Sequence, residues 1–451
     1  MSKAIDLSHI YNLRNNFTVI GLTGQIGSGC SEVAEQLSRG FNNKDFESLR
    51  EVGGIDTKTS EIKHNSYRKY RIVYNYAREN FKPYTRINYK DVLVIFLLKH
   101  SFDELISFLK SPDLKNEMEA EVPADDEGKD YAAIVPNAQF DDEAAALSEI
   151  KQTFEGLSEK YKSIQDNWND LYNFYFQSEF LSFCEKIHAA LMRTSRVKRN
   201  KLFQTISTNL RRSGSPYSFS EPTADNIFTI VELINDVIKS HRNSQNITKD
   251  ERTQIVIDDL RSPIEIMYFK QRYAAFYTMA VNRDEGSGDA EGSKQYELYQ
   301  KYKSPDSFAK AKLFFRQEYK GAKSHEFYKA NISACIQQAD IHISFLRKEE
   351  AVEKNKEIQE QNSPNKTVDS TSPYFSWKMQ LLKYVSLISH PGLVSPSPEE
   401  RCMQMAYTAK HNSGCISRHV GAAITDEFYS IKAIGWNNTP AGQVPCALRN
   451  A

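Results

Sequence analysis

The sequence predicts an α/β protein with a parallel sheet and helical insertions, followed by a second, smaller α/β unit. Thr18–Leu22 is a short apolar run typical of a buried strand, and a glycine-rich turn and a helix from about Ser31 follow it. Gln254–Asp258 (QIVID) is a second such strand, rich in β-branched residues. Near the C-terminus a helical stretch precedes two further strands. A chain of 451 residues suits two or three domains of this kind.

The composition favours a cytoplasmic protein without a membrane segment. The longest apolar run, Val92–Leu98, is too short to span a bilayer, and the N-terminus lacks the apolar stretch of a secretory signal. The six cysteines are scattered, as reduced thiols in a cytosol are. A net charge of zero offers no overall attraction to polyanions, so any nucleic-acid contact needs a local basic patch.

The first turn matches the phosphate-binding pattern G-x-x-x-x-G-K-[ST] except at one position. The residues of this loop are Gly24, Gln25, Ile26, Gly27, Ser28, Gly29, Cys30 and Ser31, with Cys30 in the place of the lysine. Its glycines allow backbone N–H groups to face phosphate oxygens, and Ser31 can ligate Mg²⁺. Cysteine does not supply the positive charge that phosphoryl transfer uses. The alternative is an ordinary tight turn between a strand and a helix.

The second strand ends in two acids, Asp258 and Asp259, and Arg261 follows them. Asp258 taken alone is typical of a strand that simply ends in an acid.

Along the chain we expect three parts: residues 1–347 with insertions at about 110–250, a charged and then Ser/Thr/Pro-rich linker at 348–373, and residues 374–451. Within the first part, Glu117–Glu143 is acidic and is expected to be an exposed loop or insertion. Leu171–Leu191 is expected to be a buried helix, and Asn282–Ser293 a flexible loop.

Arg193–Arg212 concentrates positive charge in a neutral protein. Such a run is typical of a solvated helix face, and the alternative is a contact with RNA, which needs clustered Lys and Arg.

Two stretches of the first part resemble small-molecule kinases. GLTGQIGSGCS, from Gly21, is similar to the loop GLTGGIGSGKS of dephospho-coenzyme A kinases, and VIDDLRSPIE, from Val256, resembles the acidic strand end of nucleoside-monophosphate-kinase-like proteins. This resemblance implies a kinase-like parallel sheet that binds an ATP- or GTP-like nucleotide, with Asp258 near Mg²⁺ and Arg261 near a phosphate.

The C-terminal part resembles the opening of the dCMP deaminase fold. Met403, Ala406 and Tyr407 fit one face of a helix, and Val420–Thr425 and Ile431–Ile434 fit two strands. CISRHVGAAI, from Cys415, matches C-x-x-R-x-V-G-A-x-I, and GWNNTPAGQVPC, ending at Cys446, matches G-Y-N-G-T-P-x-G-x-x-x-C. These blocks imply the first half of a cytidine-deaminase-like three-layer domain.

A degenerate kinase-like domain joined to a dCMP-type deaminase is similar to the anti-phage dCTP deaminase family. The resemblance implies a zinc-dependent deaminase of deoxycytidine nucleotides that depletes them during infection. It also implies assembly into a homo-oligomer and an inhibitory small RNA as a partner. It implies that Arg418 contacts the nucleotide phosphate and Asn437 the deoxyribose. A surface cation and a turn residue are the alternatives. Cys415 and Cys446 are either half of a structural zinc site or buried free thiols.

The catalytic signature H-x-E followed by P-C-x-x-C does not occur in this sequence. We therefore expect the catalytic residues and the Zn²⁺ ligands of the deaminase to lie beyond Ala451 in a longer form. The alternatives are a nucleotide or RNA sensor that keeps a deaminase remnant and, third, a functional nucleotide kinase.

Overall fold

The computed structural model describes residues 16–52, 65–123, 131–164, 167–244, 252–283, 308–320, 326–345, 376–416, 418–440 and 442–448. The expected linker Lys348–Pro373, and residues 284–293 of the expected loop, lie outside these ranges. Within them, no helix combines the length and the apolar character that crossing a bilayer requires.

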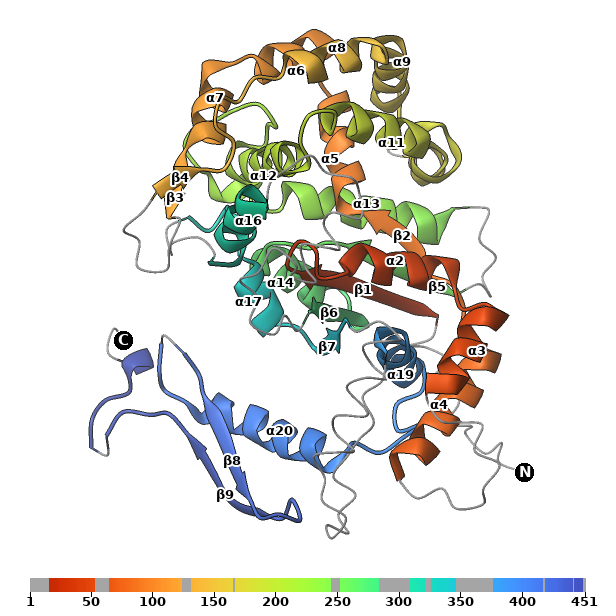
Figure 1. The fold of residues 1–451 in the computed structure, drawn as a ribbon, viewed down its shortest axis with the longest axis vertical. Helices are drawn as coiled ribbons and strands as arrows, with labels where there is room; N and C mark the ends of the chain where they lie inside the picture. Colours follow the sequence, from red (N-terminus) through yellow and green to blue (C-terminus); the bar gives the residue numbers. More distant parts are fainter. Residues whose placement is uncertain are drawn as a thin grey trace.

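A five-stranded sheet forms the centre of the fold (Figure 1). Its strands follow the order β2-β5-β1-β6-β7, and every neighbouring pair is parallel. They are β1 (Phe17–Gly24), β2 (Thr85–Asn88), β5 (Thr253–Asp258), β6 (Phe276–Asn282) and β7 (Ile341–Ser344). The predicted strands at Thr18 and Gln254 are confirmed, and so is the α/β class with a parallel sheet.

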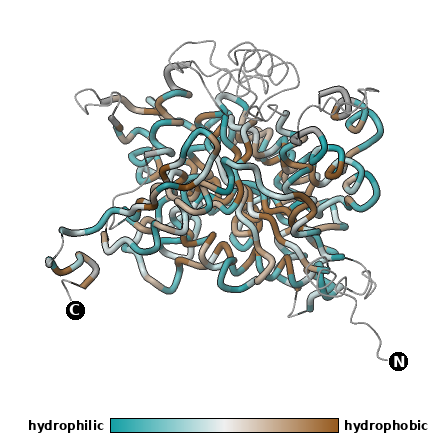
Figure 2. The backbone as a smooth tube through the Cα atoms, turned by 90° about the horizontal axis from the view of Figure 1, so that it is seen from below, coloured by the Kyte–Doolittle hydropathy of each residue, from teal (hydrophilic) through white to brown (hydrophobic). Residues whose placement is uncertain are grey.

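Alternate residues of each central strand enter different cores, because successive side chains of a strand point to opposite faces. Val19 of β1 packs with Ile255 of β5 in the larger core, whereas Ile20 of β1 packs with Val256 of β5 in a second core. Figure 2 shows the apolar positions gathered in the interior and the hydrophilic ones at the periphery. Both faces of the sheet are therefore covered, as parallel sheets require.

Helices supply both covering layers. α2 lies on the face of the second core, and α19 joins it there through Trp377, while the helices that connect β2 to β5 build the larger core. The α-helices are α2 (Cys30–Arg39), α3 (Asn43–Val52), α4 (Asn65–Asn80), α5 (Tyr89–Leu98), α6 (Phe102–Leu109), α7 (Pro112–Glu119), α8 (Asp141–Ser148), α9 (Lys151–Lys162), α10 (Trp168–Tyr172), α11 (Phe180–Leu191), α12 (Arg196–Ser213), α13 (Thr229–Asn243), α14 (Pro263–Arg272), α16 (Phe308–Lys320), α17 (Ile332–Gln337), α19 (Trp377–Ser389) and α20 (Pro398–Ala409).

The expected helix Leu171–Leu191 is buried as predicted but is not continuous. α10 passes into a π-helical turn, Asn173–Gln177, and a new helix, α11, begins at Phe180. Ser178 marks the break, since its hydroxyl donates to the carbonyl of Phe174 and accepts from the N–H of Phe180 (3.1 Å). A wider π turn of this kind interrupts the regular helix.

Glu117–Glu143 was predicted to be an exposed loop or an insertion, and the exposed loop is wrong for the residues described. Part of this stretch forms a hairpin, β3 (Glu121–Pro123) with β4 (Tyr131–Ala133), and its end begins α8. Phe140 and Glu143 are buried. Local composition misled the prediction because the Glu143 carboxylate is compensated by a cation, Lys198, from a distant part of the chain.

The reading of Arg193–Arg212 as a solvated helix face is also wrong. The stretch forms α12, whose residues are buried on most sides. Lys198 forms an ion pair with Glu143 (2.8 Å), and Arg211, fully buried, forms one with Glu265 (2.9 Å). The charges of Lys198 and Arg211 are therefore neutralised inside the protein instead of facing water.

Arg211 is the centre of a buried polar network. Its guanidinium donates to the Glu265 carboxylate and to the Tyr89 hydroxyl (2.9 Å each), and its Nε donates to the carbonyl of Tyr328 (2.6 Å). Tyr89 also donates to Glu265 (2.6 Å). Burial opposes the charge of Arg211, but Tyr89 and Glu265 outweigh it and raise the pKa of this side chain. The network ties together α5, α12 and α14.

The C-terminal residues form a helix and a hairpin, as predicted. α20 packs against β8 (Gly421–Thr425), which pairs antiparallel with β9 (Ile431–Trp436). Every residue of β9 is exposed. This unit lies at one end of the molecule in Figure 1.

Removing the carboxylate at the centre of the buried network should destabilise the fold. We expect Glu265→Gln to lower the free energy of unfolding by about 3–5 kcal/mol, because it leaves the buried charge of Arg211 uncompensated. Urea denaturation followed by circular dichroism measures the change. Asp103→Asn, which removes an exposed ion pair with Lys151, is the control and should leave the unfolding midpoint unchanged. The double variant Arg211→Met/Glu265→Leu should recover part of the loss, and equal midpoints for Glu265→Gln and Asp103→Asn would contradict the role assigned to the network.

Candidate phosphate-binding site

The glycine loop between β1 and α2 adopts a backbone conformation that residues with side chains could not adopt without strain or collision. Gly27 and Gly29 have φ values of 81° and 109°, in the left-handed region that glycine adopts without strain. A Cβ on Gly29 would lie 2.4 Å from the ring of Phe345, and one on Gly24 would lie 2.6 Å from the Val281 carbonyl oxygen. The loop is therefore held tightly against the carboxyl ends of the neighbouring strands.

Cys30 is the first residue of α2 and is buried in the core, not extended into solvent. It packs with Ile20 and Leu22, and its Sγ lies 3.5 Å from the Ser28 hydroxyl. Burial, reinforced by the nearby carboxylate of Asp259, raises the pKa of the thiol well above its usual range. The side chain is consequently neutral and contributes no charge to the loop.

Asp258 ends β5, the strand next to β1, and is buried. One of its oxygens accepts from Arg86 of β2. Burial raises the pKa of Asp258 although Arg86 acts in the opposite direction. The other oxygen, Oδ1, is buried without a hydrogen-bond partner among the described residues. An orphaned carboxylate oxygen at this place fits a water molecule or a hydrated Mg²⁺.

Asp259 and Arg261 form a second, separate charge cluster. Asp259 has a φ of 81°, unusual for a residue with a side chain. Its carboxylate accepts from the Arg261 Nε (3.0 Å), and Arg261 also donates to Glu318 of α16. Burial opposes the charge of Arg261, but these two carboxylates outweigh it and raise the pKa. Arg261, which the resemblance placed near a phosphate, is thus already neutralised by protein groups.

A small hollow of about 60 Å³ lies over the glycine loop. It is lined by residues of the loop and the start of α2, of α5, of α12 and of the turn after β5: Gln25, Ile26, Gly27, Gly29, Cys30, Ser31, Glu32, Lys90, Arg196, Asn200, Asp259 and Arg261. A water molecule needs roughly 10–15 Å³ of cavity volume. The hollow therefore has room for about four waters, a volume close to that of one phosphate group. The structure thus brings the two predicted clusters, loop and strand end, to one place.

Four residues of this hollow were not predicted as a site: Glu32, Lys90, Arg196 and Asn200. Lys90 lies two residues after the end of β2. This strand has only 4 residues and is too short to be predicted from the sequence. Arg196 and Asn200 lie in the basic segment Arg193–Arg212, whose composition predicts a solvated helix face or an RNA contact. A signal for the position of Lys90 is present in the sequence, because Asn88 is a typical capping residue and precedes a strongly apolar helix.

The C-terminal residues singled out in the sequence lie in one corner of the hairpin. Asn437 accepts from the Ser413 hydroxyl (2.7 Å) and the Val420 N–H (2.8 Å) and donates to the carbonyl of Arg418 (2.7 Å). Its amide therefore closes the loop that carries Arg418, whose own side chain is exposed.

Cys415 and Cys446 are half-buried, form no disulfide among the described residues and lie in the same corner, where Gly414 packs against Pro445. In the described part of the chain, no three or more His, Cys, Asp or Glu side chains gather as a metal site would require. Two thiols are half of the four ligands that a structural zinc takes, so the structural zinc stays a prediction.

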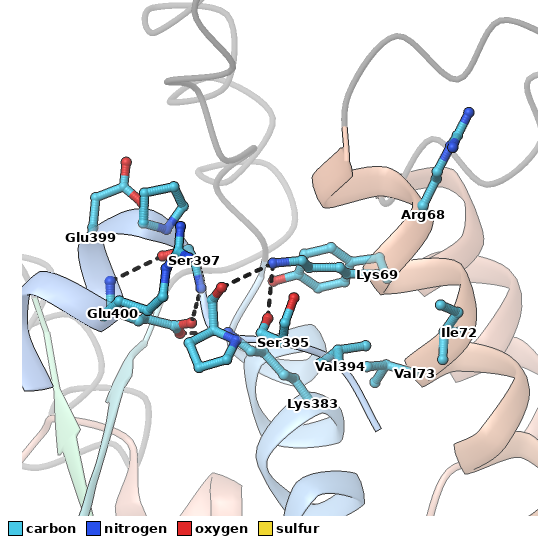
Figure 3. A pocket seen from close by; sticks show the side chains of 14 residues that line it. Arg68, Lys69, Ile72, Val73, Lys383, Val394, Ser395, Ser397, Glu399 and Glu400 are labelled. Carbon is cyan, nitrogen blue, oxygen red and sulfur yellow. Dashed lines mark hydrogen bonds and ion pairs between the residues drawn. The ribbon is translucent and has the colours of Figure 1, made fainter. Parts of the chain in front are cut away.

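A larger hollow, of about 450 Å³, separates α4 from the start of α20 (Figure 3). Lys69 of α4 donates to the carbonyls of Ser395 (2.8 Å) and Pro396 (3.1 Å), and Lys383 of α19 pairs with Glu400 (2.6 Å). These contacts join the hairpin unit to the sheet. Because both lysines are engaged by the protein itself, the hollow over the glycine loop is the better candidate for an anion.

Comparison with known proteins yields no relative: no family model, no curated protein and no solved structure matches the chain. The class that the fold and the hollow define is an α/β protein with a glycine loop at the carboxyl edge of a parallel sheet.

The buried state of Cys30 should be visible in its reactivity. We expect iodoacetamide at pH 8 to leave Cys30 unmodified in the native protein and to modify Cys446, because a buried thiol with a raised pKa holds little thiolate. Mass spectrometry of tryptic peptides measures both sites, and unfolding in urea should expose Cys30 to the reagent. Native Cys30 reacting as fast as Cys446 would show that the loop is open.

Proposed function

We propose that the protein binds the phosphate groups of a nucleotide at the glycine loop and does not transfer them. The observation that carries this proposal is the phosphate-sized hollow, bounded by loop backbone with positive φ and by cationic side chains. N–H groups at the start of a helix favour an anion through their partial positive charge. The neutral, buried Cys30 supports binding without catalysis, because the cation that stabilises transferred phosphate is missing from the loop.

A Mg²⁺ ion that accompanies the nucleotide would be held by the Ser31 hydroxyl and, through water, by Asp258. Ser31 lines the hollow, and Asp258 keeps one buried oxygen free of protein partners. The ion would neutralise charge between phosphate groups. We further propose that an ATP- or GTP-like nucleotide is the ligand, on the resemblance of the loop to those of small-molecule kinases.

As a second function, we propose that the C-terminal unit belongs to a cytoplasmic deaminase of deoxycytidine nucleotides, which the nucleotide-binding part controls. The support is the order helix, strand, strand that the dCMP deaminase resemblance requires. The alternative is a non-catalytic nucleotide or RNA sensor. The burial of α12 leaves its basic residues little surface for RNA, which favours nucleotide over RNA as the ligand.

Exposed apolar side chains on the C-terminal unit support its being part of a larger core. Met403 is 68% exposed and Phe428 69%, and a two-stranded hairpin alone is marginally stable in water. In this proposal the exposed Arg418 meets the nucleotide phosphate, and Asn437 positions Arg418 by holding its carbonyl. A zinc ion held by residues outside the described part would activate the water for such a deaminase, and the described residues would contribute only substrate contacts.

The first function predicts binding without turnover. We expect the purified protein to bind ATP or GTP with Mg²⁺, measured by isothermal titration calorimetry, and to phosphorylate no nucleoside monophosphate in a coupled assay. Ser31→Ala should weaken Mg²⁺-nucleotide binding by about tenfold, because a ligand of the ion is lost. Ser38→Ala, on the far part of the same helix, should bind normally. Efficient phosphoryl transfer, or equal affinities for Ser31→Ala and Ser38→Ala, would contradict the proposal.

The second function predicts distinct roles for Arg418 and Asn437 in a chain that also carries H-x-E and P-C-x-x-C. Arg418→Ala should raise KM for dCTP and dCMP about tenfold to a hundredfold, from a lost phosphate contact of roughly 1.5–3 kcal/mol, and leave the poor activity on deoxycytidine unchanged. Asn437→Ala should penalise all three substrates and lower the melting temperature, because it opens the loop.

The control is Asn438→Ala, whose side chain bonds only the next residue's N–H among the described residues. An equal effect of Arg418→Ala on all three substrates would make Arg418 structural. Nucleotide binding without any deamination in the longer chain would favour the sensor.

A further inference from the structure

The glycine loop lacks a cation of its own, so a bound phosphate must find positive charge elsewhere. Phosphate oxygens in a partly buried hollow need compensation, because transferring an unpaired charge out of water is costly. Cys30 is neutral, and Arg261 already serves two carboxylates. The remaining cations that line the hollow are Lys90 and Arg196.

Lys90 lies in the first turn of α5, directly after β2. The side chain of Asn88 caps this helix by accepting from the Lys90 N–H (2.9 Å), which fixes the backbone of the lysine at the carboxyl edge of the sheet. Lys90 lines both the hollow over the loop and a smaller adjoining one of about 20 Å³. Its position is therefore set by the sheet and does not depend on a surface loop.

The ammonium of Lys90 makes no hydrogen bond or ion pair within the described part of the chain. Six of the other half-buried or buried cations discussed above have a carboxylate or carbonyl partner, and Arg196 also has an interaction within the protein. The six are Lys69, Arg86, Lys198, Arg211, Arg261 and Lys383. A lysine left without a partner beside a phosphate-sized hollow is placed to bind the anion itself.

We propose that Lys90 replaces the lysine missing from the glycine loop and binds the phosphate of the ligand with its ammonium group. This inference rests on the proposed nucleotide site and adds its principal cation. It also makes binding depend on pH, since a lysine contributes charge only while protonated.

The surroundings of Lys90 hold its pKa low until an anion arrives. Burial, together with Arg199, Arg261 and Arg196 and against the opposing effect of Asp259, lowers the pKa of Lys90 to about 7. The titratable and charged groups that face it come from five sides: Arg196 and Arg199 of α12, Asp258 with Asp259 and Arg261 at the end of β5, Glu318 of α16, Glu32 of α2, and His188 of α11. A bound phosphate favours the protonated form, so binding takes up a proton above pH 7.

The test compares Lys90→Met and Lys90→Arg with the wild-type protein. Calorimetry at pH 7.5 uses two probes, Mg²⁺-ATP and inorganic pyrophosphate. We expect Lys90→Met to weaken both about tenfold to a hundredfold, and Lys90→Arg to retain most of the affinity. Lys99→Met is the matched control, because Lys99 is a lysine at the other end of the same helix and does not line the hollow. Melting temperatures establish that each variant is folded.

The pH dependence supplies a second readout that a merely structural lysine would not change. From pH 7.5 to 9 the terminal phosphate of ATP is fully ionised, since its last pKa lies near 6. Wild-type affinity for ATP should fall over this range by up to about tenfold per pH unit, as the free protein loses the Lys90 proton. Lys90→Arg should give a flat profile, because arginine stays charged, and Lys90→Met a flat and weaker one.

The two proposals fail in different ways. Pyrophosphate binding that depends on Lys90, without binding of any nucleotide, would overturn the nucleotide function and leave the role of Lys90 standing. Nucleotide binding that is the same in wild type, Lys90→Met and Lys99→Met would overturn the role of Lys90 and leave the nucleotide function standing. A wild-type pH profile shared by Lys90→Arg would also overturn it.

Discussion

The buried ion pair between Arg211 and Glu265 is the interaction on which the site depends. Arg211 anchors the C-terminal end of α12. Its partner Glu265 lies in the first turn of α14, the helix that follows β5, and accepts from the backbone N–H of Ser262 (3.2 Å). Tyr89, bonded to both, is the residue before Lys90. A buried pair of this kind adds little net stability, but it allows only one arrangement of the elements that it joins. One interaction thus sets the relative positions of three walls of the hollow.

The charges around the hollow are distributed so that an anion has a defined place. Asp259 adopts a strained φ of 81°, and its ion pair with Arg261 offsets that cost. Because Glu318 holds the same guanidinium, Arg261 serves as a wall of the site and not as a free cation. The other cations that line the hollow, Lys90 and Arg196, belong to α5 and α12. A phosphate loop of the usual pattern instead carries a lysine of its own.

The sequence predicted what is local. The strand, the glycine turn and the start of α2 follow one another in the chain, and so does the acidic end of β5, so their patterns are readable without the fold. Lys198 finds Glu143 across 55 residues, and Arg211 finds Glu265 across 54, and no local pattern reveals such partners. The basic segment therefore looked solvated although it is buried. For the same reason Lys90 escaped notice, because only the parallel pairing of β2 with β5 brings it to the loop.

A continuous series of contacts connects the glycine loop to the C-terminal hairpin. Gly29 lies directly against the ring of Phe345, and Phe345 stacks on Trp377 with ring centroids 5.0 Å apart. Trp377 begins α19, and Lys383 on that helix pairs with Glu400, which caps α20. A Cβ added to Gly29 would collide with the ring of Phe345, so the loop backbone and the ring are in direct contact. A shift of the loop backbone would therefore displace the ring and the helix that it supports. If the proposed control of the C-terminal unit by a nucleotide operates, these packed contacts are a physical connection through which it can act.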